Sequence, residues 1–109
     1  MPEAAKILGQ ASPDTGVLVT LYEVPLSSSC VVSSLVVCNR GGVDGSFRAA
    51  VAVGGAADSP EQYVYFDQPV DGNSSFVATI GITLGSLDIL RAQAGSSNMS
   101  FNLFGIEVS

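Results

Sequence analysis

The 109-residue sequence contains no histidine and no tryptophan, and only one lysine. Without histidine the chain lacks the usual general base and the commonest metal ligand. A serine nucleophile would have to rely on Lys6, close to the N-terminus. Two cysteines fall short of the four ligands that a structural zinc site needs. Acidic residues such as Asp58 and Asp67 stand at or beside predicted turns, which explains their presence. We therefore expect no enzymatic activity, no metal and no cofactor.

Charge is also scarce. Only 13% of the residues are charged, and ten acidic residues against four basic ones give a net charge of -6. A protein that binds nucleic acid through phosphates needs clustered Lys and Arg, and an anionic membrane surface makes the same demand. We therefore expect neither partner. The sequence shows no secretory signal and no apolar run of the roughly 18 residues that a spanning helix needs, which predicts a soluble product made in the cytosol.

The apolar fraction, by contrast, is high. It reaches 47%, and the mean hydropathy is +0.42. One interpretation is a well-filled core rich in small residues. The other is that part of the apolar surface is covered by a partner, because large exposed apolar patches usually mark contacts. We expect the second, with burial in an oligomer or assembly.

Turn signals recur at short intervals, and the runs between them have the length and β-branched content of strands. This pattern predicts one all-β domain over residues 1–109, an antiparallel β-sandwich of about eight strands that resembles a jelly roll, with residues 1–6 as a short N-terminal arm. The expected strands are 6–10, 17–24, 31–38, 45–53, 62–66, 75–84, 88–93 and 99–108.

Two of these runs are apolar at both parities. A strand in a two-layer sandwich has only one inner face. Apolar residues on both faces therefore mean either that the strand is central and covered on both sides, or that its outer face packs on a neighbouring subunit. The second interpretation predicts that subunits contact one another through the outward-facing residues of runs 17–24 and 31–38. The predicted contact residues are Leu18, Tyr22, Val32 and Val36.

Three arginines stand in this charge-poor chain, and arginine is favoured in interfaces because its planar fork makes bidentate pairs with carboxylates. We add Arg40, Arg48 and Arg91 to the predicted interface, with solvent-facing strand positions as the alternative. Tyr63 and Tyr65 are predicted to share a face, where they would form either a sugar-binding platform with Phe66 or a core contact.

The last run changes parity. Met99, Phe101 and Leu103 alternate on one side, and Phe104 and Ile106 then continue at the opposite parity. A β-bulge at Gly105 would return all of them to one face, whereas a twisted strand would be buried on both. Cys30 and Cys38 are predicted to lie on one extended strand, too far apart for a disulfide, as small buried residues.

Several segments, in this order, resemble a group of small virion structural proteins of tailed bacteriophages, cyanophages among them. They are KILGQ (6–10), TLYEVP (20–25), SLVVCNR (34–40), FRAAV (47–51), GITL (81–84) and SFNLFGIE (100–107).

The resemblance covers nearly the whole chain and implies a part of the virus particle, made in the host cytoplasm. Within that group it implies a capsid cement or decoration protein, which forms a trimer and binds the major capsid protein. A tail, baseplate or fibre-attachment protein is the alternative. A carbohydrate-binding module is a further alternative from a different class, and the missing tryptophan weakens it.

Overall fold

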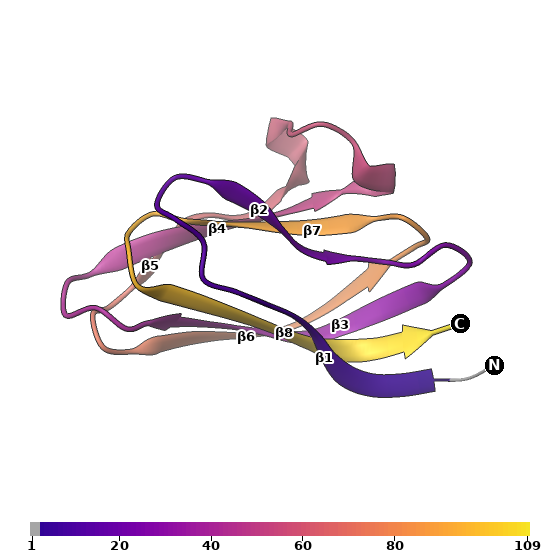
Figure 1. Cartoon of the computed structure of the whole chain (residues 1–109), viewed down its shortest axis with the longest axis horizontal. Helices are drawn as coiled ribbons and strands as arrows, with labels where there is room; N and C mark the ends of the chain where they lie inside the picture. Colours follow the sequence, from indigo (N-terminus) through magenta and orange to yellow (C-terminus); the bar gives the residue numbers. More distant parts are fainter. Residues whose placement is uncertain (1–2) are drawn as a thin grey trace.

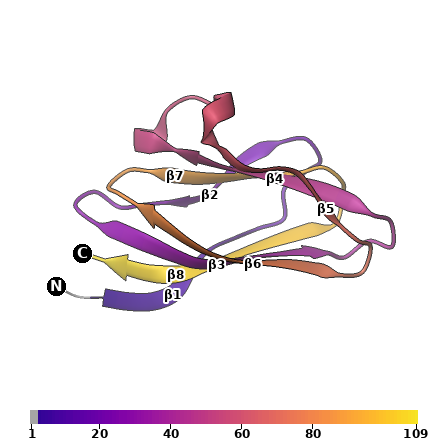
Figure 2. The same cartoon turned by 180° about the vertical axis from the view of Figure 1, so that it is seen from behind.

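The computed structural model describes residues 3–109, which form two four-stranded antiparallel sheets packed face to face (Figures 1 and 2). The strands alternate with short turns, as the sequence predicts. In chain order the elements are β1 (Glu3–Ala11), β2 (Leu18–Glu23), β3 (Ser29–Asn39), β4 (Gly45–Ala52), the 3₁₀ turns η1 (Val53–Gly55) and η2 (Pro60–Gln62), β5 (Tyr63–Val70), β6 (Ser75–Leu84), β7 (Ile89–Ala94) and β8 (Met99–Val108).

The strand order follows a simple rule. Sheet A has the order β1-β8-β3-β6, and sheet B has the order β2-β7-β4-β5. The first strand therefore pairs with the last, the second with the seventh, the third with the sixth and the fourth with the fifth, as in one long hairpin rolled over itself. Two sheets of this kind, connected by Greek keys, define a jelly roll. The predicted β-sandwich is confirmed.

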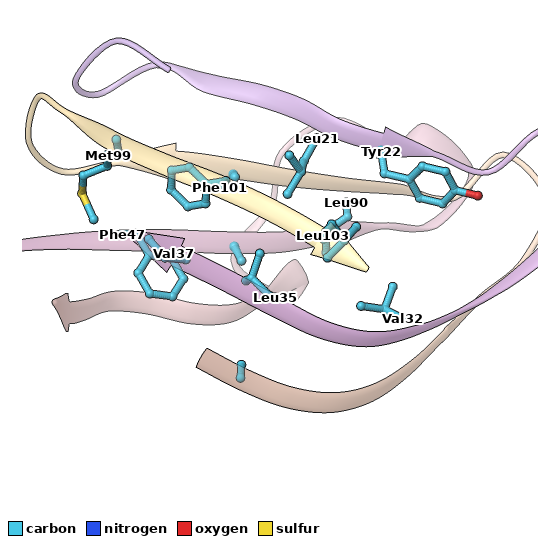
Figure 3. Packing of buried hydrophobic residues seen from close by; sticks show 14 of the residues in the cluster. Leu21, Tyr22, Val32, Leu35, Val37, Phe47, Leu90, Met99, Phe101 and Leu103 are labelled. Carbon is cyan, nitrogen blue, oxygen red and sulfur yellow. The ribbon is translucent and has the colours of Figure 1, made fainter. Parts of the chain in front are cut away.

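The core lies between the sheets and is built around Phe47 of β4 (Figure 3). Its ring lies 5.8 Å from the Phe101 ring, in an edge-to-face arrangement, and 5.6 Å from the rings of Tyr65 and Phe76. Such aromatic pairs add to the free energy gained by burial. Aliphatic residues from both sheets, among them Leu35, Leu90 and Leu103, fill the rest of the interior.

The pairing in sheet A shifts register close to Gly105, and the bulges lie on the strands beside β8. The extra residues flank Phe104 of β8: β1 inserts Leu8 between the partners of Phe104 and Leu103, and β3 inserts Ser33 between the partners of Gly105 and Phe104. A Cβ atom at Gly105 would lie 2.4 Å from the Val31 carbonyl oxygen. The bulge predicted at Gly105 is therefore wrong: β8 alternates without interruption, so Phe104 and Ile106 face outward.

Neighbouring bulges also explain the two runs that are apolar at both parities. The pairing of β2 with β7 shifts between Thr20 and Tyr22, so that Leu21 and Tyr22 are both buried. In β3 the extra residue Ser33 shifts the alternation, so that Val32 before the bulge and Leu35 after it both point inward. The expectation that Tyr22 and Val32 point outward is therefore wrong, because both belong to the core.

The first strand begins earlier than expected. Residues 3–6, predicted to be part of an arm, belong to β1, and Met1 and Pro2 lie outside the described residues. Cys30 and Cys38 both lie on β3 and are free, as predicted, but Cys38 is only half-buried.

Residues 53–62, which we call the covering loop, connect β4 to β5 and lie over the outer face of sheet B (Figure 1). Beneath them Ala50 and Ala52 are fully buried, although both face away from the core between the sheets. Arg91 of β7 fixes the loop by donating from Nη1 to the Ala56 carbonyl, at 2.9 Å, and from Nη2 to the Gly55 carbonyl, at 3.4 Å.

Candidate functional site

The outer face of sheet A carries exposed apolar side chains on all four strands. Because residues paired across antiparallel strands point to the same side, the register aligns Ala5, Ile106, Val31 and Thr83 in one row. Further rows run parallel to it. We call the apolar members of these rows the apolar face: Ile7, Val31, Val36, Val77, Phe104 and Ile106.

This face is well exposed and nearly free of charge. Ile7 is 55% exposed and Val77 60%, while Phe104 and Val36 are half-buried. In the described part of the chain, Glu3 at one corner is the only acidic or basic side chain that the register directs to this side of sheet A. An uncharged apolar sheet surface of this kind is typical of a contact surface.

A second surface lies on sheet B, beside the covering loop. It is a hollow of about 570 Å³. We call it the aromatic groove, and its lining consists of Arg48, Asp58, Ser59, Pro60, Tyr63 and Phe66.

Arg48 holds the exposed Phe66 ring in place. Its guanidinium carbon lies 3.9 Å above the ring centroid, and Nε and Nη2 donate to the two Asp67 oxygens at 2.7 and 3.2 Å. This bond keeps the pKa of Asp67 below its ordinary value and that of Arg48 above it. Asp67 adopts a φ of 54°, a region that non-glycine residues seldom occupy. The arrangement preorganises an aromatic side chain that is 60% exposed.

A third polar cluster closes one end of the sandwich. The Tyr22 hydroxyl of sheet B donates to Glu107 of sheet A at 2.5 Å, and Lys6 Nζ lies 2.8 Å from the other Glu107 oxygen. The bonds from Lys6 and Tyr22 lower the pKa of Glu107, and burial is the main cause that raises the pKa of Tyr22. Burial also raises the pKa of the nearby Cys30 thiol. The cluster joins the two sheets.

The predicted interface residues do not form one surface. Leu18 and Val36 are half-buried and lie on different sheets, while Arg91 donates hydrogen bonds to the covering loop. Arg40 donates to the Ser12 hydroxyl at 2.8 Å, and Arg48 lies in the aromatic groove. That these residues contact a partner stays a prediction for Leu18, Val36, Arg40, Arg48 and Arg91.

Sequence reasoning named Phe66 of the aromatic groove but, of the apolar face, only Val36, and it missed the more exposed Ile7 and Val77. The uninterrupted alternation of 99–108 could have placed Phe104 and Ile106 outside. Tyr63 and Tyr65 do not share a face: adjacent β4 residues pair with them, so β5 contains an extra residue between the two pairs. Tyr65 packs inward against Phe47, and Tyr63 lies beside Phe66 with ring centroids 5.3 Å apart.

No group of three or more metal-ligating side chains occurs within residues 3–109. In the same range, no helix has the length and apolar character required to cross a bilayer.

The fold and these surfaces can be compared with known proteins. No family model matches the sequence, and no curated protein matches it. The chain is similar in structure to a chain in the structure of infectious bursal disease virus, Gx strain, with a TM-score of 0.51 and 15% sequence identity. A chain in the structure of the Gt strain of the same virus has a TM-score of 0.44 and 11% identity, over 96% of this chain and 31% of that one.

The similarity to the Gx-strain chain covers 97% of this chain but 30% of the viral chain, so this chain spans less than a third of that length. At this identity the likeness shows a shared fold. The tailed-phage type that the sequence resembles is matched by no family model and stays a prediction.

Proposed function

We propose that this chain is a structural protein of a virion. The observation that carries the proposal is the jelly roll, which extends over the described chain and is shared, over 97% of its length, with a chain from a virus structure. Jelly rolls are a recurrent architecture of viral capsid domains.

Within that class we propose a capsid cement protein that forms a trimer and binds the major capsid protein, with the apolar face as its shell contact. Burial of apolar surface is worth roughly 25 cal/mol per Å² before the costs of association are subtracted. The near absence of charge on this face favours such burial, because no ionised group has to be desolvated over its central strands. Many symmetric copies would add their contributions and stabilise the shell.

The test uses shells that lack the protein. We expect the purified chain to sediment with them at a fixed copy number and to raise their melting temperature in calorimetry. Ile106→Asp places a charge at the centre of the apolar face and should abolish both effects. The control is Val43→Asp, in the loop after β3, where the side chain is 79% exposed and lies off that face.

Circular dichroism would establish that both variants fold. Shells that withstand heat and pressure equally well with and without the protein would contradict the cement function. Light scattering behind a sizing column would test the proposed trimer.

Two alternatives make different predictions. A tail or baseplate protein would be found in purified tails and absent from tail-free shells. A carbohydrate-binding module is favoured by the paired rings of Tyr63 and Phe66 beside Asp58 in the aromatic groove. Binding on a glycan array, lost in Phe66→Ala, would support that alternative, whereas silence on the array together with stable shell attachment would support the cement protein. We retain the prediction that the chain is neither an enzyme nor a nucleic-acid- or membrane-binding protein.

A further inference from the structure

Four strands of the sandwich have a free edge, and three of these strands carry charged residues or a proline. A free edge invites pairing with another chain, and proteins block it with charges, prolines or bulges. β1 carries Lys6 and a bulge, β2 carries Glu23 and a bulge, and β5 carries Pro69 with irregular pairing. The pairing of the fourth edge strand, β6, with β3 also shifts register, between Ile82 and Thr79, but β6 contains no charged residue and no proline along its ten residues.

β6 also keeps apolar surface exposed at its edge. Its inward-facing residues Phe76, Ile80 and Ile82 pack against the core but stay half-buried, since no strand covers them on the far side. On the outward side Val77 is the most exposed member of the apolar face. A strand added at this edge would cover both sets.

We propose that the free edge of β6 pairs antiparallel with β6 of a second copy of this chain, about a two-fold axis. The pleat limits the register, because outward residues must meet outward residues. With the axis at Thr79, Val77 lies opposite Gly81 of the second copy and Phe76 opposite its Ile82. Every such pair along the strand is uncharged and consists largely of residues that favour strands.

The charge of the chain favours this edge over the others. Two copies that each carry a net charge of -6 repel one another, and β6 is the free-edge strand where they approach without juxtaposing ionised side chains. The pairing would also join two four-stranded sheets into one of eight strands. The apolar faces of both copies would then lie on the same side of that sheet and form one surface.

This inference goes beyond the proposed function and does not rest on it. A two-fold contact cannot close a trimer. It would link two copies into a dimer or two trimers into a hexamer, and either assembly contains the β6 pair. Shell binding and β6 pairing can therefore succeed or fail independently.

Cross-linking tests the pairing and its register. Residues directly opposite on antiparallel strands have Cα atoms about 4.5–5.5 Å apart, within the range of a disulfide. The background is Cys38→Ser, which removes the half-buried thiol and leaves the buried Cys30. In it, Thr79→Cys should give a covalent dimer under mild oxidation. The matched control is Thr20→Cys, an exposed threonine on the edge strand β2, which should stay uncrosslinked.

A charge on the edge provides the second measurement. Thr79→Lys should halve the solution mass measured by light scattering and raise the dissociation constant about tenfold or more, because two lysines would meet at the axis. Thr20→Lys should change neither. A monomeric native chain at high concentration would overturn the inference. So would an oligomer that yields no Thr79→Cys dimer, or one whose mass Thr79→Lys leaves unchanged.

Discussion

The outer faces of the two sheets differ in what lies over them. On sheet B the chain covers its own surface: the covering loop buries Ala50 and Ala52, and Arg91 holds the loop in place. On sheet A the corresponding surface is left open, although Ile7, Val77 and Ile106 lie on it. The charge on the two outer faces differs as well: Arg48 and Arg91 point to the outer side of sheet B, whereas in the described chain Glu3 is the only charged residue that the register directs to the outer side of sheet A.

The difference lies in the charge around the exposed apolar residues: Phe66 on sheet B lies beside Arg48 and Asp58, whereas the apolar face of sheet A is nearly free of charge. A domain of this size could cover a second face only with another insertion like the covering loop, and none occurs between strands of sheet A in the described chain. The protein therefore has one face that its own loop partly covers, beside the aromatic groove, and one uncovered apolar face that is suited to contact with another molecule. The substitutions predicted below change first sheet A, which carries the apolar face, then the covering loop on sheet B, and last the contact between the two sheets.

The largest effect is expected from Gly105→Ala in sheet A. An added Cβ would lie 2.4 Å from the Val31 carbonyl oxygen and 2.9 Å from Leu8 Cδ1, so the backbone of two strands would have to shift. Overpacking of this kind costs about 1–3 kcal/mol, and we expect the upper end because backbone atoms are involved. Urea unfolding followed by circular dichroism would measure the change, since the chain has no tryptophan.

Gly81→Ala is the control for Gly105→Ala in the same sheet. A Cβ at Gly81 would meet no atom within 4 Å. We expect unchanged or slightly higher stability, because alanine restricts the unfolded chain more than glycine does. Equal stability losses in the two variants would show that the close contacts at Gly105 do not determine the stability of sheet A.

An intermediate effect is expected from Arg91→Met on sheet B. Methionine keeps an apolar stem over the sheet but loses the two hydrogen bonds to the covering loop. Bonds from a charged donor are worth about 1.5–3 kcal/mol, and we expect about 1–2 kcal/mol at this partly exposed site. Hydrogen exchange should rise in residues 53–62 and stay unchanged in β8.

Arg40→Met removes an arginine whose bond to Ser12 lies at the surface. It should change the free energy of unfolding by less than about 0.5 kcal/mol. If hydrogen exchange in residues 53–62 is unchanged in the Arg91→Met variant, the covering loop is held by other contacts. One such contact is the hydrogen bond from the Gly54 amide to the Asp88 carboxylate, at 2.8 Å.

The sequence predicted the architecture because strand length, turn residues and β-branched content are local signals. It did not predict which face each residue occupies wherever an extra residue enters a strand, as at Leu21, Ser33 and the residue between Tyr63 and Tyr65. One such residue reverses the alternation, and its position depends on the neighbouring strand. The bonds from Arg91 to the covering loop were not predicted for a similar reason: the bonded carbonyl groups lie 35 and 36 residues away in the chain, on a loop that folds back over the sheet.

The smallest effect is expected where the two sheets are joined, at Glu107. Its pKa is lowered by the hydrogen bonds from Lys6 and Tyr22, so the folded state binds the proton less readily than the unfolded chain. The stabilisation is therefore present above the ordinary glutamate pKa of 4.5 and is lost as the pH falls through the lowered folded-state value. Glu107→Gln should reduce stability at pH 7 by about 0.5 kcal/mol, since solvent screens the pair, and should have no effect at pH 2. Urea unfolding across this range, with Glu23→Gln at the exposed end of β2 as the control, would measure it. A loss that is equal at both pH values would mean that Glu107 acts through packing, and that charge contributes nothing to the link between the two sheets.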